Sequence, residues 1–447
     1  MATLPRLRPR RFYDLVIEVA LIRPGPIQGG SVHPYLRRRH GDERADLPHD
    51  SMRQALGKTL GVPLFQEQMM QMAIDCASFT PAEADQLRQA MSSKRAPERI
   101  EELRARLLDG MAARGIPPGV AEDIYVKILA FSSYGFPESH AISFAYLVYA
   151  SAWLKRYYPA AFTAALLRAQ PMGFYAPASL IGDARRHGVE VRGVDVNASA
   201  VLATLEKPTV KGHNALRRDQ PAIRLGLGDV RNLGQRADAV VAGQPYRDLE
   251  DFARRARLPA PALEALATAG AFGCFGIARR EALWAAGAAA TIRPGQLPGT
   301  TPGLAAPPLP AMTAAEETFA DLWATGTYGT HPIEHIRPGL AERGVIGAAE
   351  LRTARPGANV TVAGLVTHRQ QPGTARGVVF LGLEDETGLA NVICPPAVWE
   401  QHRRLAMEAN ALLVTGRAER LDGAVSLLAT RLRRLRVVAA ARSRDFR

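Results

Sequence analysis

The stretch LGLGDVRNLGQRADAVV (225–241) has a counterpart further along the chain in AGAFGCFGIARREALW (269–284), with Gly276 placed 42 residues after Gly234. In each copy a glycine turn leads into a segment with helical periodicity, over 235–241 and 277–284. Glycine accepts the backbone conformations of a tight turn, so each copy predicts two helices joined by a hairpin. The sequence therefore predicts a tandem helix-hairpin-helix region over 196–285.

A glycine hairpin between short helices directs backbone N–H groups at a DNA phosphate without reading bases. We expect these hairpins to bind DNA independently of sequence and with a marked dependence on salt. The alternative is ordinary helix packing through glycine. The residues expected at the DNA are Gly228, Leu233, Gly234, Phe275 and Gly276.

The segment 12–195 reads as mostly helical. Thr80-Pro81-Ala82-Glu83 forms a capping box and predicts a helix start. On that helix Ala84, Leu87 and Met91 form an apolar side, and Arg88, Ser92 and Arg95 lie on another. Arg88 with Lys94 and Arg95 could neutralise a triphosphate or a backbone phosphate. A solvated charged face is the alternative.

A second helix is expected from Ser139 until Pro159 ends it. Its residues are apolar nearly all round, which predicts a buried helix. At its start, Ser139-His140-Ala141 offers unpaired N–H groups and the positive end of the helix dipole, so His140 is a candidate phosphate ligand. The alternative is a satisfied structural histidine.

Arg23-Pro24-Gly25-Pro26 begins a stiff loop that continues through Gln28-Gly29-Gly30 to the basic run Arg37-Arg38-Arg39-His40. Proline fixes the backbone and glycine lets it approach a ligand closely. We take Arg23 as a further phosphate candidate, with a solvated basic loop as the alternative.

The C-terminal part changes character. Residues 286–312 are rich in Ala, Gly, Pro and Thr and read as a linker, followed by a short helix around 314–324. Beyond it, apolar residues alternate with period two and predict four or five short strands with one helix near 398–407, which suits a small barrel of the OB type. The expected fold is multidomain α+β. Its parts are a basic leader (1–11), helical fingers (12–195), tandem hairpins (196–285), linker and connector (286–355), OB domain (356–440) and tail (441–447).

Composition limits the possible partners. The 447 residues include 56 Lys and Arg against 43 Asp and Glu, a net charge of +13 that favours a polyanion, usually nucleic acid. The three cysteines, Cys76, Cys274 and Cys394, are far apart, so neither disulfides nor a zinc site is predicted and a cytoplasmic location fits. No signal peptide or run of 18 apolar residues is present, so no membrane association is expected.

Motifs for other chemistries are missing. The sequence has no GxxxxGK[ST] loop, GxSxG elbow or HExxH pair, and no clustered carboxylates of the kind that hold two Mg2+ ions. Asp195 beside Asn197 is a single carboxylate and predicts no metal pair.

Several strings together resemble the fingers region and following domains of bacterial C-family DNA polymerases, the DNA polymerase III alpha subunits and their error-prone relatives. They include EVALIRPGPIQGG (18–30), LGKTLGVPLFQEQ (56–68), FTPAEADQLRQAM (79–91), SYGFPESHAISFAYLVYASAWLK (133–155), GTHPI (329–333) and VVFLGLEDETGLANVI (378–393). Pro137-Glu138 and the ending SRDFR (443–447) are similar to the error-prone branch.

This resemblance implies template-directed DNA synthesis in lesion bypass and repair. It implies DNA and dNTP as ligands, Mg2+ for the complete enzyme, and a Y-family-like polymerase and a regulator as partners. Family fingers hold the triphosphate with two adjacent arginines. Here Gln89 follows Arg88, so the resemblance carries over Arg88 and His140 and not Gln89. No Gln-x-x-Leu-Phe pentapeptide follows the hairpins, and direct contact with the clamp is therefore not predicted.

In the family, a palm with three catalytic aspartates precedes the fingers, and the palm is not in these 447 residues. We therefore expect a C-terminal portion that binds dNTP and DNA, is inactive alone and needs a palm-containing polypeptide. The alternatives are a non-enzymatic DNA-binding remnant or accessory module, and a replicative alpha subunit.

Overall fold

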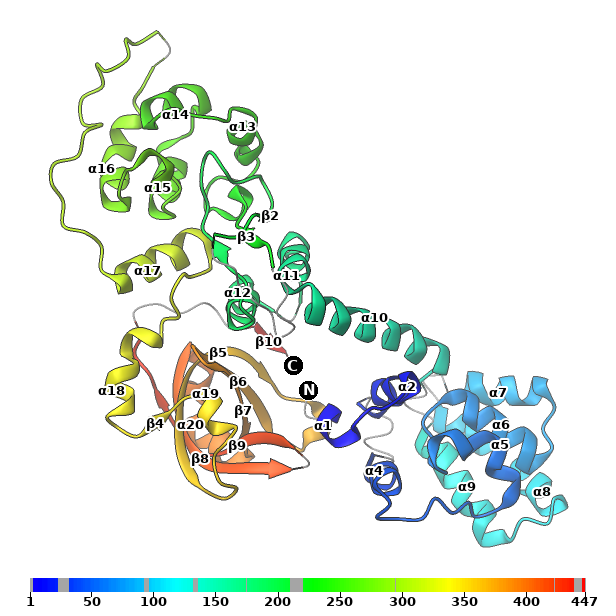
Figure 1. The fold of residues 1–447 in the computed structure, drawn as a ribbon. Coiled ribbons are helices and arrows are strands. Elements are labelled where there is room, and N and C mark those ends of the chain that lie inside the picture. Colours follow the sequence, from blue (N-terminus) through cyan, green and yellow to red (C-terminus); the bar gives the residue numbers. More distant parts are fainter. Residues whose placement is uncertain are drawn as a thin grey trace. The chain divides into compact units, whose positions relative to one another are not determined.

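The computed structural model describes residues 3–22, 32–91, 96–131, 136–173, 175–209, 220–293, 295–421, 423–437 and 444–446 (Figure 1). The chain divides into two compact units. The first comprises residues 1–152 with 421–424, and the second comprises 153–420 with 425–447. The predicted sites at Arg23, Lys94 and Arg95 lie outside the described residues.

The first unit is helical, as predicted. Its helices are α1 (Thr3–Leu7), α2 (Phe12–Leu21), α4 (Val32–His40), α5 (Arg53–Leu56), α6 (Gln66–Ala77), α7 (Pro81–Met91), α8 (Ala96–Ala113), α9 (Pro118–Phe131) and α10 (Glu138–Tyr157), the last of which continues into the second unit. The capping box at the start of α7 is confirmed. The Thr80 N–H donates to Glu83 Oε2 at 2.7 Å, and the Glu83 N–H donates to Thr80 Oγ1 at 3.2 Å. Leu87 and Met91 are buried in the core formed with α6, α8 and α9.

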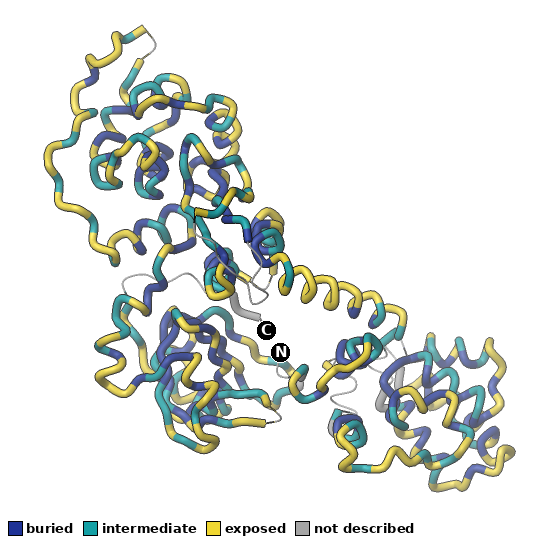
Figure 2. Tube along the Cα trace, viewed as in Figure 1, coloured by how far each residue is buried: buried dark blue, intermediate teal, exposed yellow. Residues whose placement is uncertain are grey.

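The expectation that α10 is buried is wrong. The helix has the predicted bounds within one or two residues, yet Figure 2 shows it exposed along most of its length. Only Ala141 and Ala145 are buried, whereas Tyr146 and Leu147 are 64% and 63% exposed. Apolar residues on all sides of a helix make burial favourable. Burial also needs packing partners, and among the described residues these cover only one side of α10. No described helix combines the length and apolarity needed to cross a membrane.

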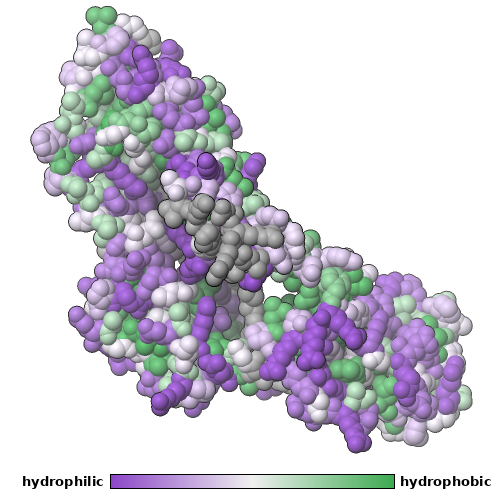
Figure 3. All heavy atoms as spheres, viewed as in Figure 1, coloured by the Kyte–Doolittle hydropathy of each residue, from purple (hydrophilic) through white to green (hydrophobic). Residues whose placement is uncertain are grey.

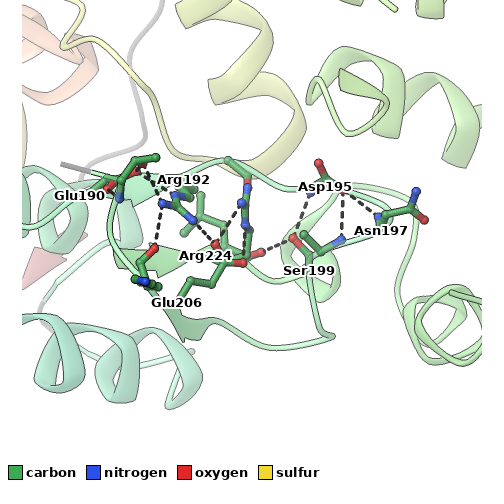
Figure 4. A network of polar contacts seen from close by, with 12 residues as sticks. Glu190, Arg192, Asp195, Asn197, Ser199, Glu206 and Arg224 are labelled. Carbon is green, nitrogen blue, oxygen red and sulfur yellow. Dashed lines mark hydrogen bonds and ion pairs between the residues drawn. The ribbon is translucent and has the colours of Figure 1, made fainter. Parts of the chain in front are cut away.

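The second unit begins with α11 (Pro159–Arg168), α12 (Pro177–Arg186) and a small sheet that the sequence did not predict. Its strands are β1 (Val191–Arg192), β2 (Thr204–Glu206) and β3 (Ala222–Arg224), in the order β1-β3-β2. An ion-pair network ties the strands together (Figure 4). Arg192 and Arg224 both contact Glu206, at 2.6 and 2.9 Å, and Arg192 also contacts Glu190. Hydrogen bonds from Arg192, then from Thr209, lower the pKa of Glu190 to about 2.

The hairpin region follows with α13 (Arg236–Ala242), α14 (Leu249–Ala256), α15 (Ala260–Thr268), α16 (Arg279–Ala289) and α17 (Ala314–Thr325). The second copy has the predicted form, with α15 and α16 joined by residues 269–278. The first copy differs, because β3 and a 3-10 turn (Leu227–Asp229) stand where a first helix was expected. The N–H groups of Leu227 and Gly228 donate to the carbonyls of Ala200 and Val201 at 2.9 and 2.8 Å instead of to a helical turn, and a Cβ on Gly226 would lie 2.4 Å from the Val201 carbonyl oxygen. This segment therefore runs against the 201–202 loop.

The segment 195–199 connects the chain just after α13 with the second copy. The Asn197 amide donates to the Tyr246 carbonyl and accepts from its N–H, both at 2.7 Å. The Val196 N–H donates to the Ala271 carbonyl at 3.0 Å. Asp195 accepts the N–H groups of Asn197 and Ala198 (Figure 4), which makes it a turn residue.

After the linker and α17, the connector holds α18 (Arg337–Ala341), β4 (Val345–Ile346) and α19 (Ala348–Leu351). The barrel is built from β5 (Asn359–Gln370), β6 (Val379–Asp385), β7 (Gly388–Cys394), α20 (Pro396–Glu408), β8 (Ala411–Leu421) and β9 (Ala424–Arg434), and β10 (Arg444–Phe446) pairs with β5. The strand order β5-β6-β7-β9-β8 closes through a β5–β8 pairing, with β7 and β9 parallel. This arrangement confirms the predicted OB-type barrel.

Candidate nucleic-acid interface

The turns of both hairpins are open on one side. Gly234 and Gly276 have φ of +54° and +73°, in the left-handed region that favours glycine, and a Cβ on either would meet no atom within 4 Å. Both glycines are exposed, as is Gly228. A ligand can therefore come close to the backbone at each turn.

Unpaired backbone donors lie at these turns. Within the described part of the chain, the N–H groups of Gly234 and Gln235 in the first hairpin and of Ile277 in the second have no hydrogen-bond acceptor. Such groups at the start of a helix attract phosphate oxygens. Each hairpin thus presents donors that suit a phosphate, the geometry that sequence-independent backbone binding requires.

The side chains of Leu233 and Phe275, the two apolar residues predicted to contact DNA, do not lie on the exposed surface of the turns. Leu233 is fully buried, and Phe275 is partly buried with its ring stacked on Phe272 at a centroid distance of 6.1 Å. Their side chains pack the hairpins onto the core. Any contact of Leu233 with DNA would have to come from its backbone.

Cations are distributed unequally between the hairpins. In the first, Arg236 is exposed and has no partner among the described residues, while Arg231 stacks over the Trp323 ring at 4.8 Å. In the second, Arg279 pairs with Asp321 at 2.7 Å and Arg280 pairs with Glu316 at 2.9 Å. The carboxylates of α17 thus neutralise the arginines of the second hairpin.

On α7, Arg88 pairs with Asp85 at 2.8 Å, and the Gln89 amide donates to the same carboxylate at 2.7 Å. Hydrogen bonds from Arg88, then from Gln89, lower the pKa of Asp85, so the carboxylate is ionised at neutral pH. The Arg88 side chain remains 41% exposed. A polyphosphate near Arg88 would compete with Asp85 for the guanidinium.

His140 is exposed in the first turn of α10, between the rings of Phe136 and Phe144 at 5.1 and 4.7 Å. Carboxylates already lie at this helix start. Glu67 accepts the Glu138 N–H at 2.9 Å, and Glu138 itself accepts from Lys58 at 2.6 Å. Among the described residues, no hydrogen bond or ion pair joins His140 to Arg88.

No group of three or more His, Cys, Asp or Glu side chains among the described residues is placed to hold a metal ion. Sequence reasoning also missed a basic cavity beside α1, α2 and α4. Its arginines lie on both sides of Asp14, and the scattered spacing gave no motif to find it by.

Comparison with known proteins gives three family matches in the order of the domains. The bacterial DNA polymerase III alpha subunit finger domain matches residues 1–115, a helix-hairpin-helix motif matches 188–282, and an OB-fold nucleic acid binding domain matches 360–435.

Relatives match over the whole chain. The error-prone DNA polymerase of Mycolicibacterium paratuberculosis is 56% identical over 454 residues, which cover 100% of this chain and 40% of that protein. The error-prone DNA polymerase of Corynebacterium efficiens is 52% identical over 453 residues, covering 100% of this chain and 41% of the relative. The chain therefore spans about 40% of the length of these relatives, in their C-terminal part. A solved asparaginyl-tRNA synthetase from Pyrococcus horikoshii covers 22% of this chain and 24% of its own, at 21% identity with a TM-score of 0.18, which is too weak a likeness to bear on function.

Proposed function

We propose that the chain is part of an error-prone member of the bacterial C-family DNA polymerases, and that it holds DNA and the incoming nucleotide for lesion-bypass synthesis. The observation that carries the proposal is the identity of 56% along the entire chain with an error-prone DNA polymerase. The cytoplasm is the proposed location, and a Y-family-like polymerase and a regulator are proposed partners of the complete enzyme.

Duplex binding is proposed for the two hairpins. The open turns at Gly234 and Gly276 and the unpaired N–H groups beside them support this role. Backbone donors contact phosphates and not base edges, so affinity should depend on salt and little on sequence.

The test is fluorescence anisotropy with a labelled duplex at low salt. Gly276→Val and Gly234→Val should each weaken binding at least about fivefold, because valine is strained at positive φ and shields the N–H groups. Gly287→Val is the matched control, since Gly287 is exposed in α16 with open space around it. Unchanged affinity in both folded hairpin variants would contradict the assignment.

Triphosphate binding is proposed for Arg23, Arg88, Lys94, Arg95 and His140, all from the part of the chain that resembles the family fingers. The Arg88 side chain, which is 41% exposed, supports this role, with Asp85 as a competing anion. Arg88→Ala should lower dNTP affinity in a complex with a palm-containing polypeptide and leave duplex affinity nearly unchanged. Equal loss of both affinities would refute a separate triphosphate role.

The family implies Mg2+ for the complete enzyme, and the described residues offer no group that fits it. We therefore assign no metal-dependent step to this chain, and we propose that it does not polymerise alone. Primer extension by the purified chain with Mg2+ and dNTPs should be undetectable, and measurable extension would contradict the proposal.

A palm-containing polypeptide would need a surface to bind, and we propose α10 as that surface. Phe144, Tyr146, Leu147 and Tyr149 are each at least 38% exposed on this helix, and hydrophobic side chains reach the surface along part of it (Figure 3). Exposed apolar areas of this kind mark protein interfaces. Leu147→Ser with Tyr149→Ser should weaken capture of the separately expressed palm of a relative, whereas duplex binding should persist.

The alternative is a non-enzymatic DNA-binding module. The engagement of Arg88 by Asp85 and of the α10 start by Glu67 favours it, since both reduce the charge available to a triphosphate. Mixing the chain with the palm of a relative separates the two possibilities. Restored primer extension supports a polymerase part, and duplex binding without extension supports the module.

A further inference from the structure

A basic cavity of about 350 Å³ lies in the first unit where the end of α1, the start of α2 and the end of α4 meet. The residues that line it are Leu7, Arg8, Arg10, Arg11, Asp14, Arg39 and His40. The cavity is at the lower end of the size range of small-molecule sites. None of its residues belongs to the hairpins or to the proposed triphosphate site.

One arginine and the single acid of the cavity hold its walls in place. Arg39 contacts both carboxylate oxygens of Asp14, at 2.9 and 2.7 Å, and donates to the Leu7 carbonyl at 2.6 Å. Asp14 also accepts the N–H groups of Arg10 and Arg11, at 2.6 and 3.0 Å. The loop that carries the remaining arginines is therefore fixed through its backbone.

Arg39 and the Arg10 and Arg11 N–H groups together compensate the negative charge of Asp14. Burial alone would raise the pKa of its carboxyl, but hydrogen bonds from Arg39 and from the Arg10 and Arg11 N–H groups outweigh burial and lower it. Asp14 is thus ionised at neutral pH, and Arg39 compensates its charge. It leaves no negative charge for the other arginines.

Arg8, Arg10 and Arg11 are exposed, and none of their guanidinium groups has an ion-pair partner in the part of the chain that the structure describes. Three like charges held around one cavity repel each other, and an anion in the cavity would relieve this repulsion. Guanidinium groups bind phosphate oxygens in pairs with favourable geometry. Both the charge and the donors match a phosphate group.

We propose that this cavity is a phosphate-binding site in which Arg8, Arg10 and Arg11 hold a polyphosphate or a nucleic-acid backbone phosphate. Asp14 and Arg39 are positioning residues that fix the loop. The site does not depend on the proposed polymerase function, because it rests on the cavity and its charge alone.

The test is calorimetric titration of the full chain at low salt with two probes, inorganic tripolyphosphate and a single-stranded oligonucleotide. Arg10→Gln with Arg11→Gln should weaken tripolyphosphate binding at least about tenfold, because two charged hydrogen-bond donors are lost. Arg44→Gln with Arg99→Gln is the matched control. Both residues are exposed and without an ion-pair partner among the described residues, so the control removes the same charge from the same unit.

Loss of affinity for both probes in the cavity variant alone supports a nucleic-acid phosphate as the source. Loss for tripolyphosphate alone supports a free polyphosphate. Equal loss in cavity and control variants, or no tripolyphosphate binding to the unaltered chain, would overturn the site. Arg8→Gln provides a second variant should the double variant not fold, and Gly276→Val should retain tripolyphosphate affinity whether or not the hairpins bind DNA.

Discussion

The two hairpins have similar sequences and different surroundings. In the first, β3 and a 3-10 turn precede the glycine turn, and Arg236 is left exposed. In the second, α15 precedes the turn, and α17 pairs with both arginines of α16 from 36 and 42 residues further along the chain. A glycine turn thus fixes the local backbone, whereas a distant helix decides which cations DNA can reach.

The largest expected effect is on the free energy of unfolding, when a buried side chain that packs a hairpin onto the core is removed. Phe272 is 1% exposed and packs edge-to-face on Phe252 at 5.1 Å. Phe272→Ala should lower the free energy of unfolding by about 3–5 kcal/mol, because the cavity left by the ring cannot fully collapse. Urea unfolding followed by circular dichroism measures this. Leu233→Ala in the first hairpin should lower the free energy of unfolding by about 2–4 kcal/mol by the same reasoning. A larger loss for Leu233→Ala than for Phe272→Ala would show that the first hairpin is packed more firmly than the second.

A second pair of variants distinguishes the cost of a steric clash from the cost of backbone strain at two glycines with positive φ. Gly270 has φ of +77°, and a Cβ there would lie 2.6 Å from Arg279 Nε, whereas Gly234 has open space. Gly234→Ala should cost about 1–2 kcal/mol from the left-handed backbone alone. Gly270→Ala should cost roughly 1 kcal/mol more, because Arg279 must move away from Asp321. Thermal unfolding measures both losses of stability, and equal losses for Gly234→Ala and Gly270→Ala would show that Arg279 moves aside at no cost in free energy.

Arg236 is exposed in the first hairpin whereas Arg280 is paired in the second, so the two arginines should contribute unequally to DNA binding. Arg236→Gln should reduce the slope of log affinity against log salt by about 0.9, as for one lost phosphate contact. Arg280→Gln should change it little, because Glu316 already pairs with Arg280. Anisotropy titrations at four salt concentrations measure both slopes, and identical slopes would remove the distinction between the hairpins.

The smallest expected effect follows from pH. Glu316 accepts the Thr313 N–H at 2.8 Å, and this hydrogen bond, followed by one from the Thr313 hydroxyl, lowers the pKa of Glu316. Its contribution to stability is therefore present above the ordinary pKa of a glutamate and lost as the pH falls through the lowered value. Glu316→Gln should flatten this part of the stability profile. By freeing Arg280 it should also raise duplex affinity by less than about fivefold, and a fall in affinity would contradict the neutralising role.

Much of this fold could be predicted from local signals. The capping box at Thr80, the glycine turns and the period-two strands of the barrel each depend on a few neighbouring residues. The sheet β1-β3-β2 was missed because strands of two or three residues are too short to show a period. The exposure of α10 and the neutralisation of Arg280 depend on residues far away in sequence, and no local pattern records them. The cavity around Asp14 was missed for the same reason, since Arg39 reaches it from 25 residues away.

The uncovered rings and aliphatic side chains of α10 also have a colloidal consequence. Such a surface restricts the orientations of the water next to it, so burying it between two molecules of the chain is favourable, and such contacts become more frequent at high concentration. Light scattering from concentrated solutions should therefore rise with added sulfate, and it should fall once serines replace Leu147 and Tyr149.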